Sequence, residues 1–434
     1  MSELLPKRES KYIKTQPLYQ NYWFQSTHRT PAKPTQDASV VDVTLSLAGF
    51  VVSSILNTSS QVSRKDSSFM LWRDVPEVKK SGLLEVLTTQ EHQHQEAMFE
   101  VITSEASYLR SLTVAVNHFS KSPELLDTLT PTERHTLFSN ILEVKEASER
   151  FLLDLEERLE ENIFFRDISD IVLRHCIDFR RVYVPYVTNQ MYQEKMLQQL
   201  ALNDEFMQVL KKLEVKPLCQ RQPLKSFLIL PFQRITRMKI LLLNILTLMS
   251  PECPMLESVR RAAEAIEEIV HACNENVKMM RQIEELVSLE KRLEFINTKV
   301  FMSKSLPLIS QTRFLVKEGE LNEISMTESR HKTGNTTKPI YLHLFNDFLL
   351  LSRREEDRFS VVDYARISRV TIDCLEAKSL VFHLWLSENH KGTVRNFVLG
   401  AENESEAQEW VDVIGAQRAG SESRNKRMLR DAKH

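Results

Sequence analysis

From about residue 91 to residue 294, apolar residues recur at alternating steps of three and four positions, which is typical of amphipathic helices. The spacing predicts a first helix that ends near Ser122, followed by helices over residues 132–159, 168–183, 205–213, 225–248 and 256–293. Proline cannot donate the backbone hydrogen bond that a helix interior needs. We therefore expect the helix over 168–183 to stop before Pro185, and Pro231 to kink the next long helix or to lie in its first turns.

Beyond Gly319 the pattern changes to short, partly alternating apolar runs that are separated by polar turns. These runs predict strands over residues 314–324, 338–352, 359–368, 370–375, 380–386 and 394–399. A closing helix over 404–417 carries Trp410 on its apolar side. The sequence therefore predicts an elongated all-α helical bundle followed by a small antiparallel β-barrel or sandwich that a C-terminal helix caps.

Composition divides the chain into four segments. Residues 1–70 are rich in Ser, Thr, Gln and Pro and read as a mostly disordered tail with one or two short helices and an apolar patch at 40–56. The helical domain is expected over 71–295 and the β domain over 296–418. Residues 419–434 are polar and basic, and we expect them to be disordered.

The glycine content and the net charge of the chain exclude some classes of function. The chain has 8 glycines among 434 residues, and none lies between Gly82 and Gly319. A helical segment without glycine has no Gly-rich loop to hold a phosphate, which argues against a kinase or a P-loop enzyme. A net charge of −2 gives no reason to expect nucleic acid as a partner.

Cysteine usage and the N-terminus indicate a compartment. The five cysteines form no CxxC pair, which fits free thiols in a reducing compartment rather than disulfides or a zinc site. The first residues lack the apolar core of a signal peptide, and the most apolar windows are shorter than the roughly 20 residues of a membrane span. We expect a cytoplasmic protein with no catalytic constellation, no metal and no cofactor.

The most informative segment is residues 226–243, where a proline and a Gln-Arg pair interrupt an apolar run. Residues four apart lie one turn above each other on a helix. This predicts one face that contains Gln233, Arg237, Leu241 and Asn244, opposite an apolar core face. A core helix with such a ridge is a candidate partner-binding helix. Arg234 has the alternative role of an ion-pair partner within the bundle.

Several motifs resemble those of the Dbl family, in which a Dbl-homology domain precedes a pleckstrin-homology domain. The first and third helical motifs of that family are similar to QEAMFEVITSEASYLRSL (95–112) and LKSFLILPFQRITRMKILL (224–242), and the end of its helical region is similar to CNENVK (273–278). The β part resembles the second domain through HLFNDFLLLSRR (343–354) and EAQEWVDVI (406–414). PLYQNYW (17–23), LWRDVPEV (71–78) and LPLISQTRFLVKEGEL (306–321) are similar to the ephexin subgroup.

The resemblance implies guanine-nucleotide exchange on a Rho-family GTPase, with a RhoA-like partner favoured, and no covalent chemistry. Glu100 would bind the first switch of the GTPase, and Arg237, with Gln233 one turn earlier, would reach the second switch. Asn274 would bind that same switch through its amide, which both donates and accepts. Leu241 and Asn244 would lie under the partner's sheet and influence which GTPase is chosen.

Two weaker implications concern regulation. Tyr19 lies in an apolar stretch of the N-terminal tail, either as part of a sticky disordered segment or in an autoinhibitory helix that a tyrosine kinase releases. Lys317, Arg330, Lys332 and Lys338 are candidates for a basic rim that contacts phosphoinositides and recruits the protein to the plasma membrane. His343 and Leu344 occupy positions where strong lipid binders carry basic residues, so a solvated loop is the favoured interpretation.

Two alternatives to exchange remain open at this point. The runner-up is a non-catalytic scaffold, in which the same fold is kept to sequester a GTPase or to serve as a membrane adaptor. A purely lipid-binding adaptor is disfavoured by the weak basic signature. Glu100 and Asn274 favour exchange, because an inactive copy would tolerate their loss.

Overall fold

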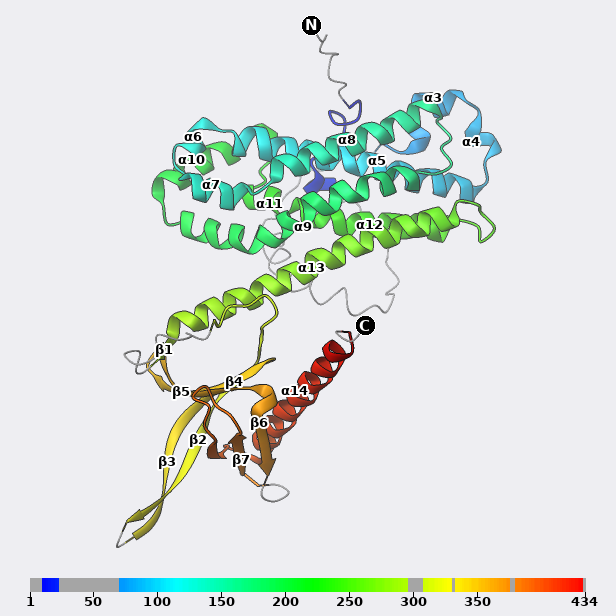
Figure 1. Ribbon diagram of the computed structural model, residues 1–434. Helices are drawn as coiled ribbons and strands as arrows, with labels where there is room; N and C mark the ends of the chain where they lie inside the picture. Colours follow the sequence, from blue (N-terminus) through cyan, green and yellow to red (C-terminus); the bar gives the residue numbers. More distant parts are fainter. Residues whose placement is uncertain (1–9, 23–69, 296–306, 330–331, 375–378, 432–434) are drawn as a thin grey trace. The chain divides into compact units, whose positions relative to one another are not determined.

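The computed structural model describes residues 10–22, 70–295, 307–329, 332–374 and 379–431 (Figure 1). It divides into two compact units, residues 1–277 and residues 278–434, which are called here the helical unit and the β unit. The predicted apolar patch at 40–56 lies outside the described residues.

The helical unit begins with a helical turn at residues 19–22 and, beyond the gap, with η1 (Trp72–Asp74), α3 (Pro76–Lys80) and α4 (Leu83–Val86). Its long helices are α5 (Thr89–Val114), α8 (Ile141–Glu161), α9 (Ser169–Leu200), α12 (Leu230–Leu248) and α13 (Leu256–Arg292), the last of which continues into the β unit. Shorter elements connect them: the π-helical turn Ala115–Ser120, α6 (Pro123–Leu126), α7 (Pro131–Phe138), α10 (Asp204–Glu214), η3 (Pro217–Cys219) and α11 (Leu224–Leu228). The apolar faces of the long helices pack into one core, which confirms the predicted bundle.

Local sequence explains where α5 and α12 begin. The Thr88 side chain accepts a hydrogen bond from the Glu91 amide, and the Glu91 carboxylate accepts one from the Thr88 amide. This reciprocal cap satisfies two donors that the first turn of α5 leaves without helical partners. Pro231 lies in the first turn of α12, as one of the two predicted alternatives has it, where its missing N–H costs nothing.

Two helix predictions were wrong. The helix expected over 132–159 is broken into α7 and α8, because Ser139 between them adopts a positive φ of 46°. The side-chain amide of Asn140 donates to the Val182 carbonyl of α9 at this break. The helix expected to stop before Pro185 continues to Leu200. Pro185 is exposed while Tyr186 and Val187 are buried, so core packing outweighs the lost hydrogen bond.

The β unit contains one sheet in the order β1-β5-β4-β3-β2-β8-β7-β6. Its strands are β1 (Leu293–Phe295), β2 (Leu315–Ser329), β3 (Lys332–Phe345), β4 (Phe348–Glu355), β5 (Arg358–Arg366), β6 (Val370–Cys374), β7 (Val381–Leu386) and β8 (Arg395–Gly400). All neighbours pair antiparallel except β1, which pairs parallel to β5. The short turn η4 (Ile367–Arg369) leads into β6, and α14 (Glu404–Asp431) closes the unit.

The inner face of this sheet is sealed by Trp410 of α14, which is fully buried. Gly319 of β2 permits the close approach, because a Cβ at that position would lie 3.2 Å from the indole ring. The antiparallel sheet with its capping helix confirms the predicted class of the second domain.

Two boundaries in the β unit differ from prediction. The strand expected over 338–352 is two strands, because Asn346 turns the chain and its amide bonds the backbone of Thr312 and Phe314. The tail expected to be disordered from residue 419 instead continues α14 to Asp431. That stretch contains no proline, so the helix can continue beyond its packed turns.

Candidate functional site

The predicted contact residues of α5 and α12 meet in an ion pair. Arg237 Nη2 lies 3.1 Å from Glu100 Oε1, and the two side chains are 16% and 29% exposed. Gln233, one turn before Arg237 on α12, is half-buried. These three residues therefore form a charged and polar patch that is partly exposed to water.

A second pair joins the same two helices inside the core. Arg234 Nη2 lies 2.6 Å from Glu105 Oε2, and both side chains are at most 2% exposed. The guanidinium also donates to Ser104 Oγ, and the Ser148 hydroxyl donates to the other Glu105 oxygen. Both charged groups of this cluster, the Arg234 guanidinium and the Glu105 carboxylate, thus have hydrogen-bond partners, as buried charges require. The expected structural role of Arg234 is confirmed.

The ridge predicted on α12 is wrong at one position. Leu241 is 2% exposed and belongs to the core, while Asn244 is exposed as expected. Arg234, Met238, Leu241 and Ile245 are spaced by four, three and four residues, which brings all four to the buried side. Leu241 is therefore not part of the accessible surface.

The exposed apolar residues of α12 are Ile240 and Leu243, which the sequence interpretation missed. They share the outer face with Asn244. The signal that could have found them is the same helical spacing, which assigns Leu241 and Leu242 to the core and places Ile240 and Leu243, three residues apart, on the outer face. Exposed aliphatic residues beside a polar patch are typical of a protein-binding surface.

Asn274 lies on α13, within the helical unit, and is half-buried. Its neighbour Cys273 is buried in the core, which fixes this part of the helix. The structure thus brings Glu100 and Arg237 together directly and places Asn274 on the third helix of the predicted set.

The N-terminal segment, residues 10–22, packs on the helical unit at two places. Residues 16–22 form the α5 anchor: Ser107 Oγ donates to the Pro17 carbonyl at 2.6 Å, and the Tyr19 amide donates to Ser111 Oγ at 2.8 Å. Gln20 and Asn21 reach the α11 region through Ser226 and Gln220. Residues 10–13 form the α8 anchor, which the sequence did not predict.

Tyr19 and Tyr22 are buried at the α5 anchor. Their rings stack with centroids 6.1 Å apart, and Tyr19 meets Tyr108 edge-on at 5.5 Å. Burial raises the pKa of both phenols, and the Glu100 carboxylate raises the pKa of Tyr22 further. Tyr22 of the α5 anchor therefore lies close enough to the Glu100–Arg237 pair for the charges of that pair to affect its pKa.

Only part of the predicted basic rim falls within the described residues. Lys317 Nζ lies 2.7 Å from Glu409 and 4.8 Å above the Trp410 ring, so this side chain is held against α14 rather than at a rim. Lys338 is exposed. Arg330 and the side chain of Lys332 lie outside the described part of the chain.

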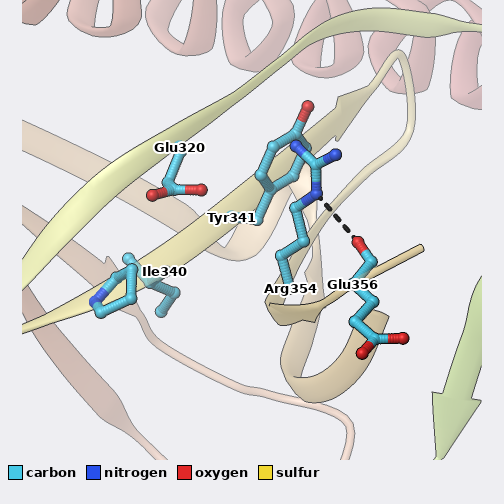
Figure 2. Close-up of a pocket in the computed structure, with 6 residues that line it drawn as sticks. Glu320, Ile340, Tyr341, Arg354 and Glu356 are labelled. Atoms are coloured by element: carbon cyan, nitrogen blue, oxygen red, sulfur yellow. Dashed lines mark hydrogen bonds between the residues drawn. The ribbon is translucent and has the colours of Figure 1, made fainter. Parts of the chain in front are cut away.

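An open pocket of about 400 Å³ lies on the β unit (Figure 2). Its lining residues are Glu320, Pro339, Ile340, Tyr341, Arg354 and Glu356. Figure 2 shows that Arg354 is turned toward the chain at Glu356, whose carbonyl accepts from Arg354 Nε at 3.2 Å. The pocket contains none of the predicted contact residues and combines charges of both signs.

The described residues contain neither a cluster of three or more His, Cys, Asp or Glu suited to a metal ion nor a helix long and apolar enough to cross a membrane. The candidate site is a surface made of α5, α12 and α13 side chains.

Comparison with known families assigns both units. Residues 97–274 match the RhoGEF domain and residues 315–418 match the PH domain. Rho guanine nucleotide exchange factor 5 of Mus musculus is 43% identical over 425 residues, which cover 95% of this chain and 26% of that protein. Ephexin-1 of Homo sapiens is 42% identical over 369 residues, which cover 82% of this chain and 51% of that protein. The chain thus spans between about a quarter and about half of these relatives.

Solved structures show the same fold at lower identity. The DH/PH domains of p115-RhoGEF superpose with a TM-score of 0.65 at 22% identity, covering 82% of this chain and all of that one. The DH/PH domains of PDZ-RhoGEF, solved with activated RhoA, give 0.64 at 21% identity, covering 80% and 99%.

Proposed function

The chain belongs to the Dbl family, in its ephexin subgroup, with a RhoGEF domain followed by a PH domain, and from this membership we propose that it accelerates GDP release from a Rho-family GTPase. A RhoA-like GTPase is the proposed partner. The observation that carries the proposal is the accessible Glu100–Arg237 pair within the RhoGEF domain, which occupies two of the predicted contact positions.

The proposed mechanism needs no bond to be made or broken in this chain. An exchange factor acts by binding the nucleotide-free conformation of the GTPase more tightly than the nucleotide-bound one. Glu100 would accept hydrogen bonds from the first switch, and Arg237, Gln233 and Asn274 would bind the second switch. The Glu100–Arg237 pair holds both side chains ready for this exchange of partners.

We assign partner choice to the outer face of α12. Asn244 keeps its predicted role, and Ile240 and Leu243 replace Leu241, which is buried. Aliphatic side chains discriminate by shape against a facing apolar residue, typically by about 1–3 kcal/mol for a changed methylene.

We also propose that the N-terminal segment inhibits exchange by covering the surface beside Glu100. The α5 anchor buries Leu18, Tyr19 and Tyr22 against the helical unit. Fully burying one large apolar side chain contributes about 1.5–3 kcal/mol, so the burial of these three side chains favours the docked segment. Phosphorylation of Tyr19 by a tyrosine kinase would add a charge of about −2 that this buried position cannot accept.

The cellular setting is a further part of the proposal. Free thiols at Cys176, Cys219, Cys253 and Cys273 support a cytoplasmic location. Recruitment to the plasma membrane would use the PH domain, where Lys338 is exposed and Lys317 is already bound within the domain. This arrangement favours a weak electrostatic contact with anionic lipid over a specific phosphoinositide pocket.

Release of a fluorescent nucleotide from Rho-, Rac- and Cdc42-type GTPases tests the proposal. We expect the full chain to accelerate release from a RhoA-like GTPase, and a chain of residues 71–434 to do so faster. No acceleration with any GTPase, even after residues 1–70 are removed, would overturn the exchange function. Tight binding without acceleration would establish the scaffold alternative.

The contact residues are tested separately with Glu100→Ala and Asn274→Ala. Each should lower the exchange rate by about tenfold or more, as truncation of an interface hot spot does. Glu257→Ala is the matched control, because that exposed carboxylate lies 17 residues earlier on α13 than Asn274. Full activity of both variants would overturn the assignment of the site and leave the function standing.

A further inference from the structure

The α8 anchor holds the N-terminal segment through one buried carboxylate. Ser10 Oγ donates to Glu156 Oε1 at 2.5 Å, and the amides of Lys11 and Tyr12 donate to the same carboxylate at 3.3 and 3.4 Å. Glu156 belongs to α8 and is 1% exposed. Ser10 Oγ also accepts from the Ile13 amide at 3.2 Å, so this hydroxyl links the turn at residues 10–13 to the helix.

The surroundings of the α8 anchor are acidic. Lys11 Nζ lies 2.5 Å from Glu160, one turn beyond Glu156. Burial raises the pKa of Tyr12 to about 12, with further contributions from Glu156, Glu77 and Glu160. Three carboxylates therefore act on this anchor, and an added negative charge would be repelled.

The two anchors work on different helices of the same unit. The α8 anchor depends on Glu156, and the α5 anchor depends on Ser107, Ser111 and the groove for Tyr19. Only residues 14 and 15 separate them, so each keeps the other at a high effective concentration. Loss of the α8 anchor should therefore loosen the α5 anchor without any change in its own contacts.

The sequence around Ser10 is predominantly basic, as in substrates of basic-directed kinases. Lys7 and Arg8 precede Ser10 by three and two positions, Glu9 lies directly before it, and Lys11 follows it. Kinases select substrates in part by such flanking charges. Ser10 is half-buried, in contrast to Tyr19, which is fully buried, so the serine is the more accessible of the two hydroxyls.

We propose that Ser10 is a phosphorylation site for a serine/threonine kinase that recognises basic residues, and that its modification releases the N-terminal segment. The γ-phosphoryl group of ATP is transferred to Ser10 Oγ, the hydroxyl proton passes to a base of the kinase, and ADP leaves. The phosphate replaces a hydrogen-bond donor by a group with a charge of about −2 at hydrogen-bond distance from Glu156. Release of the α8 anchor then exposes Tyr19 to its own kinase. The effect on exchange rests on the proposed function, whereas the release of the segment does not.

Hydrogen–deuterium exchange on the full chain, with phosphoserine incorporated at position 10, tests the release directly. Amides of residues 10–22 should exchange at least about tenfold faster than in the unmodified chain, because two anions about 4 Å apart near a surface repel strongly. Ser10→Ala sets the effect of losing the hydrogen bond alone. Unchanged protection in the phosphorylated chain, or protection equal to that of Ser10→Ala, would overturn repulsion as the cause.

Two controls isolate the charge. In a Glu156→Gln background, the same phosphoserine should accelerate exchange much less. Phosphoserine at position 405, an exposed residue of α14, should leave residues 10–22 protected. An equal acceleration in either control would contradict the proposed contact with Glu156.

The kinase is tested with a purified basic-directed kinase, ATP and the full chain, followed by mapping of phosphopeptides. Ser10 should be modified, and a Lys7→Ala, Arg8→Ala double variant should be modified at least about tenfold more slowly. Absence of phosphate at Ser10 would overturn the assignment of the kinase class. Opening of the segment without faster nucleotide exchange would instead overturn the proposed inhibition and leave this site intact.

Discussion

Two arginines one turn apart on α12 form ion pairs with two glutamates of α5, and their surroundings differ sharply. Arg234 and Glu105 are at most 2% exposed and share their remaining groups with Ser104 and Ser148. Arg237 and Glu100 are 16% and 29% exposed. The same pair of residue types therefore serves structure at one level of the helix interface and remains available to a partner at the next.

The difference follows from the cost of burying charge. Moving an ion into the protein interior costs several kcal/mol, which is recovered only when every polar group of the cluster is satisfied. Such a cluster has no capacity left for a ligand. A pair that water partly screens contributes less to stability, and each of its groups can exchange its partner for another of similar charge. Burial thus separates the two roles more clearly than residue type does.

The largest expected effect comes from breaking the buried pair. Arg234→Met leaves Glu105 charged and unpaired in the core, and should lower the unfolding free energy of the helical unit by about 3–5 kcal/mol. Urea unfolding followed by far-ultraviolet circular dichroism measures the change. Arg234→Met combined with Glu105→Leu should recover most of the loss, because no unpaired charge remains. A single variant that loses less than about 1 kcal/mol would contradict a structural role for the pair.

The exposed pair should respond in the opposite way. Arg237→Ala is expected to change the unfolding free energy by about 1 kcal/mol or less, since water partly screens this pair. Its nucleotide-exchange rate should fall by about tenfold or more, because the variant removes the charged contact proposed with the GTPase. The same urea series and the fluorescent-nucleotide assay measure both quantities. Stability loss equal to that of Arg234→Met would remove the contrast between the two levels.

The sequence predicted the fold class because helical and strand periods survive in each half of the chain. What it could not predict are the places where tertiary packing overrides a local signal. Pro185 lies within α9 because its neighbours Tyr186 and Val187 are buried. The positive φ of Ser139 separates α7 from α8, and the pattern of apolar residues does not predict this backbone conformation.

The site was predicted in the same partial way. Glu100, Arg237 and Asn274 came from motif resemblance, and the structure places the first two in contact. The prediction for Leu241 was wrong because Leu241 lies three residues after Met238 and seven after Arg234, which places it on the buried side of α12 although it also lies four residues after Arg237. The contact of Ser10 with Glu156 joins residues 146 positions apart, and neither carries a local signal for it.

A pair with one buried and one exposed partner sharpens the comparison. His343 of β3 is fully buried, and its Nδ1 lies 3.2 Å from Glu318 Oε2, whose side chain is more than a third exposed. Burial lowers the pKa of His343, although the hydrogen bond that its ring donates to the Glu318 carboxylate raises it, and Arg292 adds to the lowering.

As pH falls, His343 of the unfolded chain therefore binds a proton at a higher pH than His343 of the folded chain. Stability of the β unit should be complete above the unfolded pKa of about 6.5 and should fall, by at most about 1.4 kcal/mol per pH unit, as pH drops toward the lowered folded pKa. Hydrogen exchange of the β3 and β4 amides between pH 7.5 and pH 5, corrected for intrinsic rates, measures this slope. His343→Gln should flatten the slope, and an unaltered slope would show that other groups cause it.

The smallest expected effect concerns a third cation on α12. Lys239 Nζ lies 2.8 Å from Glu267 of α13, where the two side chains are 18% and 57% exposed. Water screens this pair and the long side chains lose entropy on pairing, so Lys239→Ala should change the unfolding free energy by no more than about 0.5 kcal/mol. A loss of 2 kcal/mol in the urea series would show that exposure of one partner does not suffice to weaken a pair. The burial of both partners would then no longer explain why Arg234 has a structural role and Arg237 does not.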